Sequence, residues 1–152
     1  MSAVEDVART AADRGLRVAT AESLTSGLLA SRVGAGSGAS EWFTGGVVAY
    51  RTEMKEKLLG LTPGTDPCSA TCAEQLAAGV RELMDADVAV STTGVGGPDA
   101  EDGHEPGTVF VGWATREGTG HRALQLDGDP EDVLEATVDA ALSQLLTRME
   151  SL

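Results

Sequence analysis

Apolar residues recur every three or four positions in the first segment of the chain, which predicts an amphipathic helix over 2–14. The residues at this spacing are Val4, Val7, Ala8 and Ala11. Gly15 follows, where helices commonly end in a left-handed residue. A second helix is predicted at the end of the chain, with Asp129 as N-cap and Pro130 as its first residue. Its buried stripe comprises Leu134, Val138, Ala141, Leu142, Leu145 and Met149.

Between these helices, short apolar runs alternate with segments at helical spacing. The runs predict strands at 16–21, 45–50, 87–93, 109–115 and 122–126. The intervening segments predict helices at 24–33, 53–59 and 73–84. A capping box of Thr71 and Glu74 is expected before the last of these. Residues 117–120 are a connection short enough for an antiparallel hairpin.

This order of elements predicts an α/β fold with three α/β/α layers around one mixed, mostly parallel sheet that includes an antiparallel hairpin. The length of 152 residues and the hydrophobic content of 41% are typical of one globular domain, here residues 1–152. Trp42 and Phe43 follow a glycine-rich loop and belong either to an oligomer interface or to the core. A homo-oligomer is expected.

The acidic composition limits the partners of the chain. Eleven Lys and Arg against 24 Asp and Glu give a formal charge of −13, which would repel a nucleic-acid backbone. Residues 1–14 lack the apolar stretch of a signal peptide, and no apolar run of 18 residues occurs. We therefore expect a cytoplasmic protein that acts on a small molecule and binds neither nucleic acid nor a membrane.

The cysteines and histidines do not form a metal-binding pattern. Cys68 and Cys72 are too few for a disulfide framework and have no partners for a zinc site. Neither His104 nor His121 has another ligand type at metal-binding spacing. We expect free thiols and no metal.

Ser23 lies between a predicted strand and a predicted helix, where a hydroxyl can face solvent. The first N–H groups of that helix, from Thr25, Ser26 and Gly27, would point at any negative charge that develops nearby. Ser23 is thus a candidate nucleophile. A lone serine at such a place is more often an ordinary N-cap.

Lys55 and Tyr50 are candidates to support a nucleophile at Ser23. Lys55 follows the second predicted strand, and its amine could act as the base if burial keeps it neutral. Tyr50, the only tyrosine, ends that strand and could relay a proton or orient the lysine. The alternatives are a solvated surface lysine and a tyrosine packed at the rim of the domain.

A glycine-rich loop directly follows the third predicted strand. Gly94, Gly96 and Gly97 could present backbone N–H groups to a phosphate, with hydroxyls from Thr93 and Thr108. Neither the GxxxxGK[ST] nor the GxGxxG nucleotide motif is present, and a GxSxG elbow with a histidine partner is missing as well.

Four segments in order resemble the CinA C-terminal-domain family. They are 20–27 (TAESLTSG), 46–50 (GVVAY) with Lys55, 93–98 (TGVGGP) and 106–110 (PGTVF). The resemblance covers nearly the whole chain. It implies an amidase that hydrolyses nicotinamide mononucleotide to nicotinic acid mononucleotide and ammonia in pyridine-nucleotide recycling, with no cofactor.

The resemblance also implies roles for single residues. Ser23 would be the nucleophile, Lys55 its general base and Tyr50 a supporting proton-relay group. Together with the expected helix start, it gives a substrate site formed by Thr25, Ser26, Gly27, Thr93, Gly94, Gly96, Gly97 and Thr108.

The chain departs from the family pattern at three places. The family's AESCTGG has Leu24 and Ser26 here instead of the cysteine and the first glycine. The family's Lys-Pro-Val-Gly-Thr is replaced by 104–108 (HEPGT), and the arginines of its Gly-Asp-Arg…Val-Arg stretch are missing from 128–134. Acids crowd the glycine loop at Asp99, Glu101, Asp102 and Glu105. Two alternatives therefore stand beside the amidase: a non-catalytic nucleotide- or phosphate-binding regulatory paralogue, and an amidase for a less anionic substrate.

Overall fold

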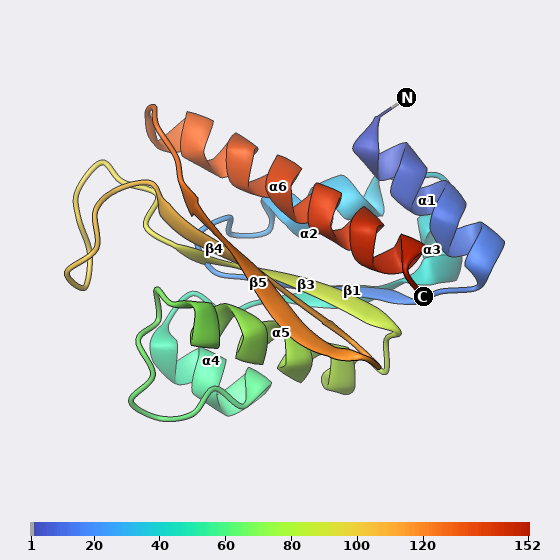
Figure 1. Cartoon of the computed structure of the whole chain (residues 1–152), viewed down its shortest axis with the longest axis horizontal. Helices are drawn as coiled ribbons and strands as arrows, with labels where there is room; N and C mark the ends of the chain where they lie inside the picture. Colours follow the sequence, from blue (N-terminus) through green and yellow to red (C-terminus); the bar gives the residue numbers. More distant parts are fainter. Residues whose placement is uncertain (1) are drawn as a thin grey trace.

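A mixed five-stranded sheet forms the centre of the structure, and helices pack on both of its faces (Figure 1). This computed structural model describes residues 2–152, so residue 1 of the expected domain lies outside the described part. The strands are β1 (Val18–Glu22), β2 (Phe43–Val48), β3 (Val88–Gly94), β4 (Thr108–Thr115) and β5 (Gly118–Gln125). The helices are α1 (Ala3–Arg14), α2 (Leu28–Gly34), α3 (Ala39–Trp42), α4 (Thr52–Leu59), α5 (Ala70–Leu83) and α6 (Pro130–Glu150).

The strand order β2-β1-β3-β4-β5 combines a parallel core with an antiparallel end. β1 pairs in parallel with β2 and β3, whereas β4 is antiparallel to both β3 and β5. Glu22, the last residue of β1, is opposite Val48 and Thr92 of its two neighbours. The carboxyl ends of these three strands therefore meet at one edge of the sheet, and open α/β sheets commonly bind ligands at such an edge.

The helices form two layers, so the three-layer α/β/α prediction is confirmed. Figure 1 shows α6 with α1, α2 and α3 on one face of the sheet, and α5 with α4 on the other. The core under α6 includes Val7, Val18, Leu29, Val90 and Leu145. The core under α5 includes Ala19, Leu59, Leu61, Leu76 and Val80.

The two terminal helices begin and end largely as their local sequence predicts. The helix α1 ends at Gly15, whose φ of 65° is left-handed. The helix α6 starts at Pro130, and Asp129 forms a capping box with Asp132. These signals lie within one helical turn, so they act without help from the rest of the fold.

The helix α5 and the strand β5 both begin earlier than predicted. The helix α5 begins at Ala70, since the Ser69 hydroxyl accepts the N–H of Cys72 at 3.1 Å. The expected capping residue Glu74 instead accepts hydrogen bonds from Thr119 and the His121 ring on β5. The hairpin turn is also shorter than expected, since pairing already resumes at Gly118.

The second strand lies two residues earlier than predicted. It ends at Val48, where its partner β1 ends, so Ala49 and Tyr50 lead away from the sheet. Trp42 is only 4% exposed and belongs to the core, and Phe43 packs against the same cluster. The core interpretation of Trp42 is thus the correct one.

The described part of the chain, residues 2–152, contains no helix long and apolar enough to cross a membrane. Within the same residues, no group of three His, Cys, Asp or Glu side chains could hold a metal ion. Cys68 and Cys72 are both buried free thiols, as predicted.

Candidate functional site

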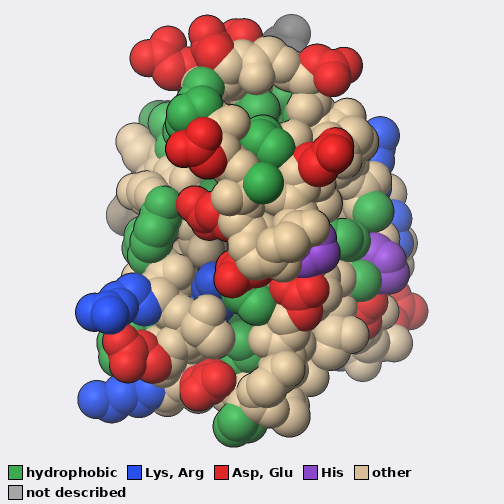
Figure 2. Space-filling view, turned by 90° about the vertical axis from the view of Figure 1, so that its left-hand side faces the viewer, with side chains coloured by type: hydrophobic (Ala, Val, Ile, Leu, Met, Phe, Trp, Pro, Cys, Tyr) green, Lys and Arg blue, Asp and Glu red, His purple; other side chains and the backbone are tan. Residues whose placement is uncertain are grey.

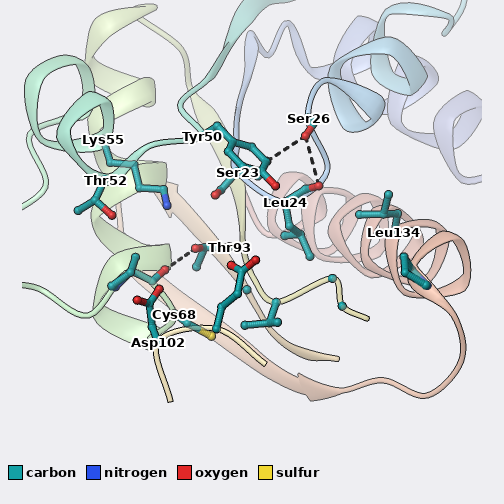
Figure 3. A pocket seen from close by; sticks show the side chains of 17 residues that line it. Ser23, Leu24, Ser26, Tyr50, Thr52, Lys55, Cys68, Thr93, Asp102 and Leu134 are labelled. Carbon is teal, nitrogen blue, oxygen red and sulfur yellow. Dashed lines mark hydrogen bonds between the residues drawn. The ribbon is translucent and has the colours of Figure 1, made fainter. Parts of the chain in front are cut away.

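A cavity of about 320 Å³ lies at the carboxyl edge of β1 and β3 (Figure 3). Its volume is within the range of small-ligand sites. Five segments meet in it: the turn after β1, the start of α4 with the residue Tyr50 before it, the segment before α5, the end of β3 with the glycine loop, and the first turns of α6. The lining residues are Ser23, Leu24, Ser26, Tyr50, Thr52, Lys55, Pro67, Cys68, Thr93, Gly94, Val95, Gly96, Gly97, Glu101, Asp102, Pro130 and Leu134.

Ser23 is placed in this cavity by the end of β1. Its backbone N–H donates to the Thr92 carbonyl of β3 at 3.1 Å, which continues the sheet by one residue. The side chain is 7% exposed and lines the cavity, and its hydroxyl has no hydrogen-bond partner among residues 2–152. A hydroxyl that lines a cavity and has no partner is available to a ligand.

The segment after Ser23 is a turn and not the start of a helix, which corrects the prediction of a helix over 24–33. The helix α2 begins only at Leu28. The turn is closed by a hydrogen bond from the Ser26 N–H to the Ser23 carbonyl at 3.1 Å. Ser26 and Gly27 both have positive φ, 50° and 104°, so neither residue is part of a right-handed helix.

The three expected contact residues of this turn have different surroundings. Ser26 lines the cavity. Thr25 does not line it, because its hydroxyl is buried between Glu22 and Thr92. The N–H of Gly27 donates to the Glu22 carboxylate at 3.1 Å and is not free for a ligand.

We expect Ser26→Gly to stabilise the protein by about 0.5–1 kcal/mol, because glycine adopts a positive φ without the steric cost that serine has there. Urea unfolding measures the change. Asp85→Gly is the matched control, since Asp85 also has φ 50° but lies outside the cavity. A loss of stability in Ser26→Gly alone would mean that the serine hydroxyl holds the turn.

Lys55 is a buried cation that points into the cavity. It lies on α4, is 3% exposed, and has no ion-pair or hydrogen-bond partner within residues 2–152. Figure 3 shows its amine extending into the space between Ser23 and Thr93. The amine is therefore open to a ligand that enters the cavity.

Tyr50 lies at the rim of the same cavity. Its side chain is 64% exposed and has no hydrogen-bond partner among the described residues. Figure 3 shows Tyr50 near Ser23, on the side away from α6. The structure therefore brings Ser23, Lys55 and Tyr50 together around one space.

The glycine loop forms the wall opposite Lys55. Gly94, Gly96 and Gly97 all line the cavity. Thr93 also lines it, although its hydroxyl donates to the Pro67 carbonyl at 2.5 Å. Thr108 does not line the cavity, since its hydroxyl donates to Gln125 at 3.2 Å.

Within the described residues, the loop is joined to the segment before α5 by a side-chain hydrogen bond. His104 and Asp66 are 2.7 Å apart. Partial burial raises the pKa of Asp66. Hydrogen bonds from the Cys68 N–H and the His104 ring outweigh this effect and lower the pKa below its usual value. The sequence places His104 and Asp66 far apart, so nothing in it indicates this contact.

The charges around the cavity are mostly acidic. Lys55 is the one cation among the lining residues, whereas Glu101 and Asp102 are two anions. Arg51 lies outside the lining and pairs with Glu53 at 3.1 Å. Figure 2 shows this end of the molecule, where acidic side chains surround the hollow and few basic ones appear. A phosphate monoester would find little electrostatic support here.

Cys68 lines the cavity but is not activated. Burial, followed by the nearby Asp66 carboxylate, raises the pKa of its thiol to about 11. Because only the thiolate attacks, Cys68 is not a rival nucleophile at neutral pH. Neither Cys68 nor Leu134 of α6 was expected in the site, and no local motif marks them.

A sequence model of the family described as the CinA C-terminal domain matches residues 1–149. A competence-damage inducible protein of Bacillus cereus (strain AH187) is 40% identical over 144 residues, which cover 91% of this chain and 35% of that protein. A competence-damage inducible protein of Bacillus subtilis (strain 168) is 42% identical over 115 residues, which cover 73% of this chain and 28% of that protein. The chain thus spans about a third of the length of these curated relatives.

Solved structures of similar proteins cover the chain almost completely. A CinA superfamily protein from Klebsiella pneumoniae superposes with a TM-score of 0.93 at 30% identity, covering 99% of this chain and 97% of its own. A CinA superfamily protein from Escherichia coli superposes with a TM-score of 0.92 at 32% identity, covering 96% of this chain and 88% of its own.

Proposed function

Because the chain belongs to the CinA C-terminal domain family, we propose that it is an amidase that hydrolyses nicotinamide mononucleotide to nicotinic acid mononucleotide and ammonia. The observation that carries the proposal is the pairing of two functional groups in one cavity. Ser23 and Lys55 are each less than a tenth exposed and line the cavity, and the hydroxyl and the amine both lack partners within residues 2–152. A nucleophile with an adjacent base is the arrangement of Ser–Lys hydrolases.

In the proposed mechanism, the Ser23 oxygen attacks the carboxamide carbon while Lys55 accepts the hydroxyl proton. Lys55 then gives this proton to the departing nitrogen, and the C–N bond breaks to release ammonia and leave an ester on Ser23. Water attacks that ester, and Lys55 takes its proton and returns it to Ser23 as the C–O bond breaks. The products are ammonia and a carboxylic acid, and the enzyme is regenerated without a cofactor.

The oxyanion donors of the proposal are also in the turn after Ser23. The N–H groups of Leu24 and Thr25 have no hydrogen-bond partner in the described chain, whereas that of Ser26 is used within the turn. Leu24 lines the cavity, so we propose its N–H as the main donor to the developing negative charge. Tyr50, at the rim, would face the substrate and support proton transfer.

The direct test is to incubate the purified protein with nicotinamide mononucleotide and to quantify both ammonia and nicotinic acid mononucleotide. Equal amounts of the two products from the wild type, and none from Ser23→Ala, would support the amidase. A folded wild type that leaves the nucleotide intact would rule out this substrate. If the intact nucleotide were bound, the chain would be a binding paralogue.

The acids of the cavity favour a second candidate, an amidase for a less anionic amide such as nicotinamide riboside. We expect Glu101→Gln with Asp102→Asn to lower KM for the mononucleotide by about 3- to 10-fold, because two charges that repel the phosphate are removed. KM for the riboside, whose ring is a cation, should stay equal or rise. Steady-state ammonia release with both substrates measures the difference.

The matched control is Glu105→Gln, which removes an acid of the same loop that does not line the cavity. Its KM values should equal those of the wild type. Equal shifts of KM for both substrates in the double variant would contradict the charge argument.

A further inference from the structure

The most unusual buried group beside the cavity is the carboxylate of Glu22, which the proposed reaction does not use. Glu22 is the residue before Ser23 and is 1% exposed. No Lys, Arg or His pairs with it in residues 2–152. A buried carboxylate without a cation is costly unless hydrogen bonds compensate it.

Four donors compensate this carboxylate. Oε1 accepts the Thr25 hydroxyl at 2.5 Å and the N–H groups of Gly27 at 3.1 Å and Leu29 at 2.8 Å. Oε2 accepts the Ala30 N–H at 2.9 Å. Three of these donors are backbone groups at the start of α2, where the helix dipole favours a negative charge. Both oxygens of the carboxylate therefore have hydrogen-bond donors.

These bonds enclose Ser23 on both sides. The Thr25 hydroxyl donates a hydrogen bond to Glu22. Its oxygen is also 2.9 Å from the Thr92 hydroxyl and can accept a hydrogen bond from it. The Ser23 N–H donates to the carbonyl of the same Thr92. The turn is thus fastened to Glu22 and to β3 immediately before and after the nucleophile.

We propose that Glu22 is a positioning residue for Ser23: its carboxylate fastens the turn and the start of α2 together, and so fixes where the hydroxyl points. Glu22 also occupies N–H groups at the start of α2, so within this turn the N–H groups of Leu24 and Thr25 remain for the substrate. The inference rests on the proposed amidase, because positioning matters only if Ser23 reacts. A small misplacement of a nucleophile lowers turnover strongly without changing substrate binding.

Steady-state ammonia release separates positioning from binding. Glu22→Gln, which removes the charge and turns one acceptor into a donor, should lower kcat by about 10- to 100-fold and change KM by less than about 2-fold. Glu74→Gln, which removes a carboxylate far from the cavity, should change neither. An unchanged kcat in Glu22→Gln, with an active wild type, would overturn the inference and leave the amidase intact.

A second pair of variants tests the same link if Glu22→Gln does not fold. Thr25→Val removes only the hydroxyl that joins Glu22 to Thr92, and Thr25→Ser keeps it. Thr25→Val should have a lower kcat than the wild type, and Thr25→Ser should have a kcat close to that of the wild type. Thr137→Val is the control, because Thr137 is an equally buried threonine whose hydroxyl bonds within α6. Equal kcat values in the two Thr25 variants would contradict the inference.

Amide hydrogen exchange tests the fastening itself without turnover. The N–H groups of Gly27, Leu29 and Ala30 should be protected in the wild type and exchange at least about tenfold faster in Glu22→Gln, with no change in Glu74→Gln. Unchanged protection would overturn the inference even in an active enzyme. An inactive wild type with this loss of protection would refute the amidase, and with it the catalytic role of Glu22, while the fastening would stand.

Discussion

Lys55→Ala is expected to lower ammonia release from nicotinamide mononucleotide by at least ~10²-fold, because the only basic side chain that lines the cavity would be gone. Ser23 would then lack a group to accept its proton and to protonate the leaving nitrogen. The loss should appear in kcat, measured as ammonia released per enzyme under substrate saturation. Lys57→Ala is the matched control, since Lys57 is on the same helix but exposed.

Stability distinguishes a catalytic Lys55 from a structural one. Lys55→Met keeps most of the length of the buried side chain and removes an amine without a partner, so it should not destabilise the protein toward urea. A variant that is at least as stable as the wild type and yet inactive fits a group retained for chemistry. Full activity in Lys55→Ala would remove lysine from the mechanism and leave Ser23 without its proposed base.

Gly112→Ala is expected to destabilise the protein by about 3 kcal/mol, because β4 and α5 touch there through their backbones. A Cβ at Gly112 would overlap the Ala73 carbonyl and lie 2.6 Å from the Ser91 hydroxyl oxygen. That hydroxyl already donates to the same carbonyl at 2.5 Å. Backbone atoms of a packed helix cannot turn aside as a flexible side chain can, so α5 would have to move.

Urea unfolding measures the effect of Gly112→Ala, and Gly34→Ala is its control. A Cβ at Gly34 would make only ordinary contacts with the Phe43 ring, at 3.8 Å, and its backbone needs no positive φ. The control should be neutral or slightly stabilising. Equal stability of the two variants would show that α5 can shift away from the sheet at little cost.

The parts of the fold that the sequence predicts correctly depend on neighbouring residues. The α6 start follows from Asp129 and Pro130, and the α1 end from Gly15, because each signal acts within one turn. The order of the elements predicts the layers, because helices that alternate with the strands of one sheet pack on both of its faces. Likewise, Ser23 directly follows β1 and Thr93 lies at the end of β3, which places them at the same edge.

The parts that the sequence does not predict depend on contacts between distant residues. The start of α2 was expected at residue 24, but the Glu22 carboxylate takes up the helix N–H groups four residues later. An acid that follows an apolar strand and precedes a serine is a local signal that could have indicated this. No such signal marks Cys68 or Leu134, which reach the cavity only through the packing of α5 and α6.

The two sides of the cavity are built with unequal stiffness. On one side, Pro130 and Leu134 belong to the first turns of α6, the helix that closes the main core, so moving them would disturb the whole domain. On the other side, the loop around Glu101 and Asp102 is largely exposed and is joined to the segment before α5 by the His104–Asp66 pair. Any change in the shape of the cavity must therefore come from the loop, while the wall formed by α6 stays in place.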